Sequence, residues 1–323
     1  MNKYMVSIVI PNYNGKDYLE DCIKSIYENC TVPVEIIIID NASVDDDLCW
    51  IKTYYKEVTL KRLKRNYGFS YAVNRGIMLA THPYVLLLNN DTKILEGFVE
   101  SMLAMIGRDE KIFGVSSQML RYDDPTVIDD AGDSYTLLGY TKKRGDGQQA
   151  TEFDTPCEVF SACAGAALYR KSVFDEIGYF DQSFFAYMED VDISYRARNY
   201  GYKNVYCPDA KVLHIGSATS GSRHNAFKVR LAARNNVYVP YKNMPMPQLL
   251  LNMPFIVGGV AVKAAYFAKK GYGEEYIGGV KEGVSTLGNV RREKFNPNHV
   301  ANYLNVQKQL ICNTAKIIFR AKD

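Results

Sequence analysis

The chain has 323 residues and a mass of 36.6 kDa, with 47% apolar and 23% charged residues. These proportions exclude a disordered, collagenous or disulfide-scaffold protein, and the length suits one large α/β unit with an appendage or two domains. Residues 1–210 carry 22 basic and 31 acidic side chains, whereas residues 211–323 carry 17 basic and 5 acidic ones. An acidic body with a basic tail argues against a nucleic-acid-binding protein and indicates that the tail meets something anionic, such as a phospholipid surface or a phosphorylated substrate.

The seven cysteines form no CxxC pair and lie mostly among apolar residues. This pattern predicts reduced thiols and therefore a reducing compartment. The apolar run before Pro11 is too short for a signal peptide. We therefore expect a cytoplasmic protein, located at the cytosolic face of the plasma membrane.

The first 110 residues alternate short apolar runs with amphipathic stretches. The pattern predicts strands at 6–10, 34–39, 58–63 and 84–88, and helices at 16–28, 45–56 and 70–80. Strands that alternate with helices of 10–15 residues indicate βαβ units. The predicted fold is therefore α/β, with a mostly parallel sheet covered by helices on both faces.

Beyond residue 110 the pattern loosens. We expect a strand at 112–116, then a long loop or lid over 121–155, where Asp, Gly and Thr are abundant. Order returns with 160–169, and helices are predicted at 171–177 and 189–200 because a glycine closes each. This organisation divides the chain into a body over 1–236, with halves 1–110 and 111–236, and a helical tail over 237–323.

The tail contains a nearly uncharged stretch at 249–268 that almost suffices to span a bilayer. Lys263 and Pro254 argue against a span, so we expect a pair of helices that lie on the membrane or pack on the body. If the stretch does not meet an anionic membrane surface, it packs on the body or forms a homodimer contact.

Polar residues follow three of the predicted strands. Asn12 follows the first strand, Asp40 the second, and Asn90 and Asp91 the fourth. The carboxyl ends of parallel strands share one edge of a sheet, where ligands bind. The alternative for each residue is ordinary capping of the helix that comes next.

An ordered series of motifs resembles family 2 glycosyltransferases of the Rossmann-like GT-A fold, particularly the rhamnosyltransferase-like branch. The series runs in order over about 5–236 and comprises SIVIPNYN, IDNAS, NYGF, NRG, LNND, GAA, FD, FF, EDVD and the stretch from His214 to Ser217. The resemblance implies a nucleotide-diphosphate sugar as donor, either dTDP-rhamnose or a UDP-hexose. It further implies a glycan or a lipid-linked molecule as acceptor. By this resemblance, 1–236 is the catalytic domain, with a nucleotide-binding half at 1–110 and an acceptor and catalytic half at 111–236.

The resemblance also assigns roles to residues. It places Pro11, Tyr13 and Asp40 at the nucleoside, with Asn66, Asn74 and Asn90 elsewhere at the donor. For the segment around Asn66 and Asn74, the alternative is a turn with an N-cap at Asn66 or Ser70. The diphosphate needs a divalent cation, Mn²⁺ or Mg²⁺. Asp91 is the charged residue left in the D-x-D-like motif, and His214 matches a position that completes the metal site.

The acceptor hydroxyl must lose its proton as it attacks. Glu189, Asp190 and Asp192 crowd three acids into four positions, and burial among carboxylates brings an acid's pKa towards neutrality. A helix N-terminus that favours acids is the alternative. The family has its base in this acidic pair, so we predict Asp190 as the base, with Glu189 second, and inversion at the anomeric carbon.

Two other functions remain open. A sugar-1-phosphate nucleotidyltransferase shares the α/β architecture, but needs a glycine-rich basic loop after the first strand, where this chain has Asn12-Tyr13-Asn14-Gly15. A non-catalytic nucleotide-sugar or glycan-binding scaffold of a membrane assembly would not need both Asp91 and Asp190. The sequence leaves the sugar, the acceptor and the oligomeric state undecided.

Overall fold

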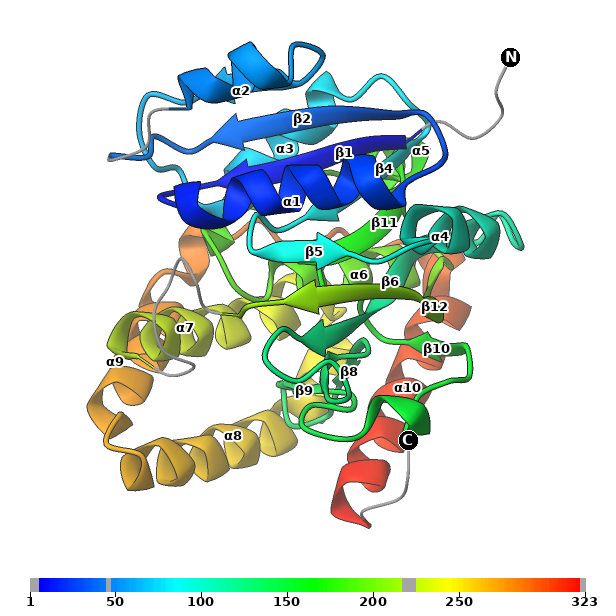
Figure 1. Cartoon of the computed structure of the whole chain (residues 1–323). Coiled ribbons are helices and arrows are strands. Elements are labelled where there is room, and N and C mark those ends of the chain that lie inside the picture. Colours follow the sequence, from blue (N-terminus) through cyan, green and yellow to red (C-terminus); the bar gives the residue numbers. More distant parts are fainter. Residues whose placement is uncertain (1–5, 45–47, 217–224, 320–323) are drawn as a thin grey trace.

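The computed structural model describes residues 6–44, 48–216 and 225–319. A ten-stranded sheet forms the centre of the molecule, and helices cover both of its faces (Figure 1). The C-terminal helices extend from one end of this body. The α/β class and the helical tail predicted from the sequence are confirmed.

The N-terminal half forms a parallel sheet in the order β4-β1-β2-β3. Its strands are β1 (Val6–Asn12), β2 (Val34–Asp40), β3 (Thr59–Arg62) and β4 (Tyr84–Leu88). The apolar residues of β1, β2 and β4 are almost completely buried because both faces of the sheet are covered. All four strands match the predicted ones to within a few residues.

The second half continues the same sheet through β11 (Ala166–Arg170), β6 (Ile112–Arg121) and β12 (Lys203–His214). β11 runs antiparallel between β4 and β6, and β12 runs parallel to β6. Along the path from β12 to β3, β11 is thus the reversed strand among seven, and the central sheet is mostly parallel. Short antiparallel strands are added at the edges by β5 (Thr92–Ile94), β7 (Ile128–Asp130) and β10 (Cys157–Val159).

Helices pack on both faces because each presents an apolar stripe. One face carries α1 (Lys16–Asn29), α2 (Cys49–Tyr54) and α4 (Phe98–Ile106). The other face carries α3 (Phe69–Leu79), α5 (Lys171–Ile177) and α6 (Glu189–Asn199). The first three residues of the predicted 45–56 helix lie outside the described residues, and α2 is shorter than predicted.

The expectation of a long loop or lid over 121–155 is wrong. Besides β7, the segment contains a hairpin of β8 (Asp133–Tyr135) and β9 (Thr141–Lys143), and the 3-10 turn Ala150–Glu152. Ile128, Tyr135 and Phe153 are buried and pack against the body. The many Asp and Gly residues suggested a loop because the strands have only three residues each, too few to show a periodicity.

The tail consists of α7 (Ala226–Asn243), α8 (Met246–Lys269), α9 (Gly273–Ser285) and α10 (Val300–Ile318). The proposed boundary at 236/237 falls inside α7, so the body and the tail share a continuous helix. The expected helix pair over 249–268 is wrong, because α8 is one helix that contains Pro254. A third core joins the body to the tail: Tyr135, Phe184 and Tyr195 pack with Val239, Met244, Val306 and Leu310.

Candidate active site

The polar residues predicted at three strand ends do meet at one edge of the sheet. Asn90 donates to Asn12 Oδ1 at 2.7 Å, and Asn12 donates to Asp40 Oδ1 at 3.2 Å. This edge lies where the chain order reverses between β1 and β4, the usual ligand position in such a sheet. The capping alternative is wrong, because the N-cap residues of α1, α2 and α4 are Gly15, Leu48 and Gly97, none with a side-chain capping bond.

Asp40 is fully buried and organises this edge. Its Oδ1 accepts from the Ser43 hydroxyl at 2.5 Å, and its Oδ2 lies 3.2 Å from Arg62 Nε. No hydrogen bond reaches Oδ2 in the described chain. The Arg62 side chain is 60% exposed, so this ion pair is the side of the Asp40 carboxylate that is open to solvent.

The other residues predicted to bind the donor differ in their burial and in the hydrogen bonds that they already make. Pro11 and Tyr13 are half-buried at the end of β1. Asn66 accepts from Asn41 at 2.9 Å and from the Gly68 amide at 2.9 Å, so it forms the turn that was the alternative for this residue. Asn41, which the sequence analysis did not single out, thereby ties the end of β2 to this turn.

Asn74 is buried and both ends of its amide are already bonded. Its Nδ2 donates to the Phe180 carbonyl at 2.7 Å, and its Oδ1 accepts from the Phe180 amide at 3.0 Å. The N-cap predicted at Asn66 or Ser70 is also absent, since the N-cap residue of α3 is Gly68 and no side chain caps this helix. The side chain joins α3 to the chain before α6, and we do not retain it as a donor contact.

Asp91 and His214 lie together beside the end of β4. His214 Nε2 is 3.5 Å from Asp91 Oδ1, and His214 Nδ1 is 2.8 Å from Asp129 Oδ2. β12 brings His214 here through its pairing with β5. Asp129 was missed by the sequence analysis because it belongs to the segment interpreted as a loop.

The charges around His214 suit a cation. Burial alone would lower the pKa of His214, but hydrogen bonds to Asp129 and Asp91 outweigh it and raise the pKa to about 9. Two carboxylates that favour an imidazolium also favour a metal ion next to a neutral imidazole whose other nitrogen is held by Asp129. The described residues contain no group of three or more potential ligands, so substrate phosphates and water would have to complete the coordination of a metal at Asp91 and His214.

Asp190 lies at the same edge, over the start of β11. Its Oδ2 accepts from the Ala164 amide at 3.5 Å, and the neighbouring Gly165 carbonyl accepts from the Asn89 amide at 2.8 Å. Asn89 is two residues before Asp91 in the chain. The predicted base, in the first turn of α6, therefore lies against the start of β11, the strand that pairs with the end of β4 just before Asp91.

The three acids of α6 have different environments. Burial raises the pKa of Asp190 to about 6, against backbone hydrogen bonds from Val191 and Ala164 that lower it. Burial and the Asp190 charge raise the pKa of Glu189 further, and its Oε2 has no hydrogen-bond partner. For Asp192, the nearby Lys242 and Arg196 charges overcome the effect of burial and hold the pKa below its usual value. Among these three acids, Asp190 is thus the one whose pKa is about 6.

A second group of acids lies near Asp190 and was also missed. Asp130 and Asp133 come from β7 and β8, and burial raises the pKa of both. Lys143 of β9 lies 3.7 Å from Asp130 and 3.6 Å from Asp129. The signal available in the sequence was the close spacing of the acids in Asp129-Asp130-Ala131-Gly132-Asp133.

The backbone before α6 is strained. Phe185, Tyr187 and Met188 all have positive φ, at 62°, 68° and 70°. Such conformations cost about 1–3 kcal/mol each in a non-glycine residue and persist only where other contacts enforce them. Asn235 of α7 supplies these contacts, since its Nδ2 donates to three carbonyls, those of residues 184, 186 and 187, at 2.7–2.9 Å.

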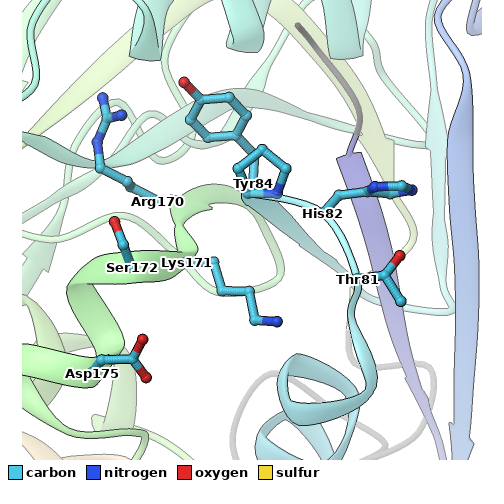
Figure 2. A pocket seen from close by; sticks show the side chains of 8 residues that line it. Thr81, His82, Tyr84, Arg170, Lys171, Ser172 and Asp175 are labelled. Atoms are coloured by element: carbon cyan, nitrogen blue, oxygen red, sulfur yellow. The ribbon is translucent and has the colours of Figure 1, made fainter. Parts of the chain in front are cut away.

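A cavity of about 450 Å³ lies elsewhere. Figure 2 shows its lining, which includes Tyr84, Arg170 and Lys171. Tyr84 begins β4 and Arg170 ends the antiparallel β11, so this cavity lies at the opposite edge of the sheet from Asp91. Arg170 donates to the carbonyls of Ile106 and Ile112, and Lys171 to that of Ala80, so both cations stabilise chain turns.

The model of the family "Glycosyl transferase family 2" matches residues 7–178, more than half of the chain. The chain belongs to this glycosyltransferase family. The N-acetylglucosaminyl-diphospho-decaprenol L-rhamnosyltransferase of Mycobacterium tuberculosis is 28% identical over 240 residues, which are 67% of this chain and 78% of that protein. A low-salt glycan biosynthesis hexosyltransferase of Haloferax volcanii is 24% identical over 71% of this chain and 73% of its own length.

Solved structures share the fold. A mannosyltransferase from Pyrobaculum calidifontis, in complex with GDP-Man and Mn²⁺, aligns over 99% of this chain and 89% of its own, with a TM-score of 0.52 and 16% identity. GalNAc-T7 with UDP, GalNAc and Mn²⁺ aligns over 72% of this chain and 47% of its own, with a TM-score of 0.59 and 20% identity. The GT-A fold predicted for this glycosyltransferase is therefore confirmed.

Proposed function

We propose that this glycosyltransferase inverts the anomeric centre as it moves a sugar from a nucleotide-diphosphate donor to a hydroxyl group, with Asp190 as the general base. The observation that carries the proposal is the position of Asp190. It is a carboxylate with a pKa of about 6, in the first turn of α6 and against the start of β11, which pairs with the strand that leads to Asp91. An acid with this pKa is mostly ionised at neutral pH, yet basic enough to accept a proton.

The donor nucleoside binds beside Pro11, Tyr13 and Asp40 in this proposal. Asp40 Oδ2 takes a hydroxyl or a base N–H of the donor when Arg62 moves aside, since this oxygen has no other partner in the described chain. Asn90 holds the edge below the donor through Asn12. Asn66 acts through the turn that it forms with Asn41 and Gly68.

The diphosphate lies over Asp91 and His214. These two side chains would hold Mn²⁺ or Mg²⁺, which when bound neutralises charge on the departing diphosphate. Asp129 fixes the His214 ring so that Nε2 points towards Asp91. An imidazole ligand suits Mn²⁺ better than Mg²⁺. Lys228, at the start of α7, adds a cation whose charge interacts with that of Asp91.

The transfer step uses one base. Asp190 accepts the proton of the acceptor hydroxyl as the oxygen forms a bond to the anomeric carbon. The bond from that carbon to the phosphate oxygen breaks, and the nucleoside diphosphate leaves with the electron pair. Attack from the side opposite the leaving group inverts the configuration. Glu189 is not assigned this role, because burial and the Asp190 charge raise its pKa well above the usual value for a glutamate.

The acceptor in this proposal is a glycan or a lipid-linked glycan intermediate at the cytosolic face of the plasma membrane. The name of the mycobacterial relative, which transfers L-rhamnose to a diphospho-decaprenol-linked sugar, supports this class. The donor is dTDP-rhamnose or a UDP-hexose. GDP-mannose enters the test because the Pyrobaculum mannosyltransferase binds it.

The test is a transfer assay with each of these nucleotide sugars and Mn²⁺, read by nucleotide release and by NMR of the product anomer. We expect one donor to give a product with inverted configuration. A product with retained configuration contradicts the single-base mechanism. If a nucleotide sugar binds but its sugar is transferred to none of the glycan or lipid-linked acceptors tried, the scaffold alternative is favoured.

A further inference from the structure

Helix α8 packs on the body along a single stripe that runs its whole length. Asn252 exchanges two hydrogen bonds with Gln307 of α10, both of 2.8 Å. Gly259 lies so close to the 138–140 turn that an added Cβ would be 2.1 Å from the backbone oxygen there. Lys263 Nζ is 4.5 Å from the centroid of a tyrosine ring in the same turn. Residues spaced in this way share one face of a helix.

The rest of the α8 surface is apolar and exposed. Its large side chains are 46–64% exposed at six positions: Leu250, Leu251, Phe255, Val257, Val262 and Tyr266. Between Met246 and Ala268 the charged residue is Lys263, which points to the tyrosine ring instead. A continuous exposed apolar surface of this kind marks an interaction site.

The way α8 is packed decides between crossing a bilayer and lying on it. Among the described residues, α8 is the helix long and apolar enough to span, and 17% of its most apolar window is buried. A spanning helix must be surrounded by lipid or by other membrane-embedded protein. α8 is instead held against α10, the 138–140 turn of the body and α9. It can therefore present one face to a bilayer but cannot cross it.

Cations flank this apolar face. Lys269 and Lys270 are exposed at its C-terminal end. At its N-terminal end, Arg292 Nη1 lies 3.7 Å from Met246 Sδ. The chain beyond residue 210 carries 17 basic and 5 acidic residues. Basic residues beside an amphipathic helix favour an anionic lipid surface over an uncharged one.

The last turn of α10 reaches the same end of the molecule. In Figure 1, α8 (yellow-orange) runs along the lower edge, and the C-terminal end of α10 (red) comes down to that edge. Ile318 and Phe319 in that region are 64% and 79% exposed, and Lys316 beside them is exposed as well. Two separate helices thus contribute apolar and basic residues to this end.

We propose that the outer face of α8, together with the C-terminal end of α10, binds the surface of an anionic bilayer, with α8 parallel to the membrane plane. We call this surface the α8 face. The tail is then a monotopic membrane contact rather than an anchor that spans.

The α8 face is linked to the active site by one hairpin. The 138–140 turn, on which Gly259 and Lys263 pack, joins β8 to β9. Asp133 of β8 and Lys143 of β9 belong to the charged group near Asp190. Membrane binding through α8 therefore places this charged group close to the bilayer, which suits an acceptor whose hydroxyl is held near the surface by a lipid phosphate. This last step rests on the proposed function, whereas the membrane contact does not.

The test is vesicle flotation of the full chain without any substrate. Two kinds of vesicle are compared: uncharged vesicles of phosphatidylcholine alone, and anionic vesicles that also contain about 30% phosphatidylglycerol. The test variant is the pair Val257→Gln and Val262→Gln on the α8 face. The matched control is the pair Tyr54→Gln and Met78→Gln, exposed apolar residues at 76% and 51% on α2 and α3. A third variant, Lys269→Gln with Lys270→Gln, changes charge but not apolar area.

We expect the wild type and the control pair to float with anionic vesicles, and the α8 pair to lose at least about tenfold in partitioning. The lysine pair should bind less well and less salt-dependently. Circular dichroism confirms that each variant is folded.

The proposal is overturned if the wild type does not float at low salt, or if the α8 pair floats as well as the wild type. A wild-type dimer in solution that the α8 pair converts to monomer also overturns it, because the face is then a contact between two copies. Sugar transfer to a water-soluble acceptor is measured separately. A failure of the proposed membrane contact can then be distinguished from a failure of the proposed transferase activity.

Discussion

Helix α6 has two sides that treat neighbouring carboxylates in opposite ways. On the side that faces the start of β11, Asp190 has backbone amides and other acids around it, and its pKa rises to about 6. On the tail side, Asp192 is bonded to Lys242 at 2.9 Å, to Arg196 at 2.9 Å and to Asn243 at 2.8 Å, and its pKa falls. Two residues of the same type, two positions apart, thus differ because of what other elements bring to them.

The tail has an active part in this difference. Lys242 and Asn243 belong to the last turn of α7, which is also the helix that carries Asn235. α7 therefore neutralises Asp192 on one side of α6 and holds the strained backbone before Asp190 on the other. The following variants test the side of α6 that carries Asp190 and the metal site proposed beside it.

The largest effect is expected for Asp190→Asn. This change keeps the shape but removes the base, so we expect kcat to fall about 10³-fold. Calorimetry should show that nucleotide binding with Mn²⁺ is unchanged. The matched control is Asp175→Asn, an exposed residue of α5, which should retain wild-type kcat. Near-normal turnover of Asp190→Asn would disprove its assignment as base.

A smaller effect is expected for Asn235→Ala. Loss of its donations to residues 184, 186 and 187 frees the strained turn, and a misplaced Asp190 should lower kcat about 10- to 100-fold. Unfolding should show a loss of about 1–3 kcal/mol. Asn236→Ala is the control, because the Asn236 amide donates within its own helix, to the Ala232 carbonyl. If both variants lose the same stability and neither loses kcat, Asn235 does not position the base.

The next effect concerns metal affinity. Asp129→Asn weakens the hold on His214 Nδ1, so we expect Mn²⁺ to bind about 10-fold more weakly in the presence of the nucleotide. Electron paramagnetic resonance of free Mn²⁺ measures this directly, without turnover. Asp124→Asn, an exposed change in the same segment, should leave the affinity as it is. Equal affinities of the two variants would mean that Asp129 does not act on the metal site.

The sequence predicted the donor side of the site better than the acid side. Asn12, Asp40 and Asn90 lie at the ends of buried strands, and because these strands are parallel their carboxyl ends meet at one edge. Asp129, Asp130 and Lys143 belong to three-residue strands held by contacts distant in sequence, so no local pattern could place them. The opposite pKa shifts of Asp190 and Asp192 depend on α7, whose packing the sequence also did not show.

For α8, composition suggested a broken helix, because Pro254 and two glycines are poor helix formers. Packing overrides this preference at Gly259, where the absence of a side chain lets α8 approach the 138–140 turn.

The most direct test of the central claim is the pH dependence of kcat for the wild type at saturating donor, acceptor and Mn²⁺. Saturating metal matters because protonation of His214 would weaken metal binding. A base acts only when deprotonated, so a pKa of about 6 for Asp190 predicts that kcat falls as pH decreases, to half its plateau near pH 6. A profile that stays flat from pH 8 down to pH 5 would contradict the account, because Asp190 would then either have an ordinary carboxylate pKa or play no part in the proton transfer.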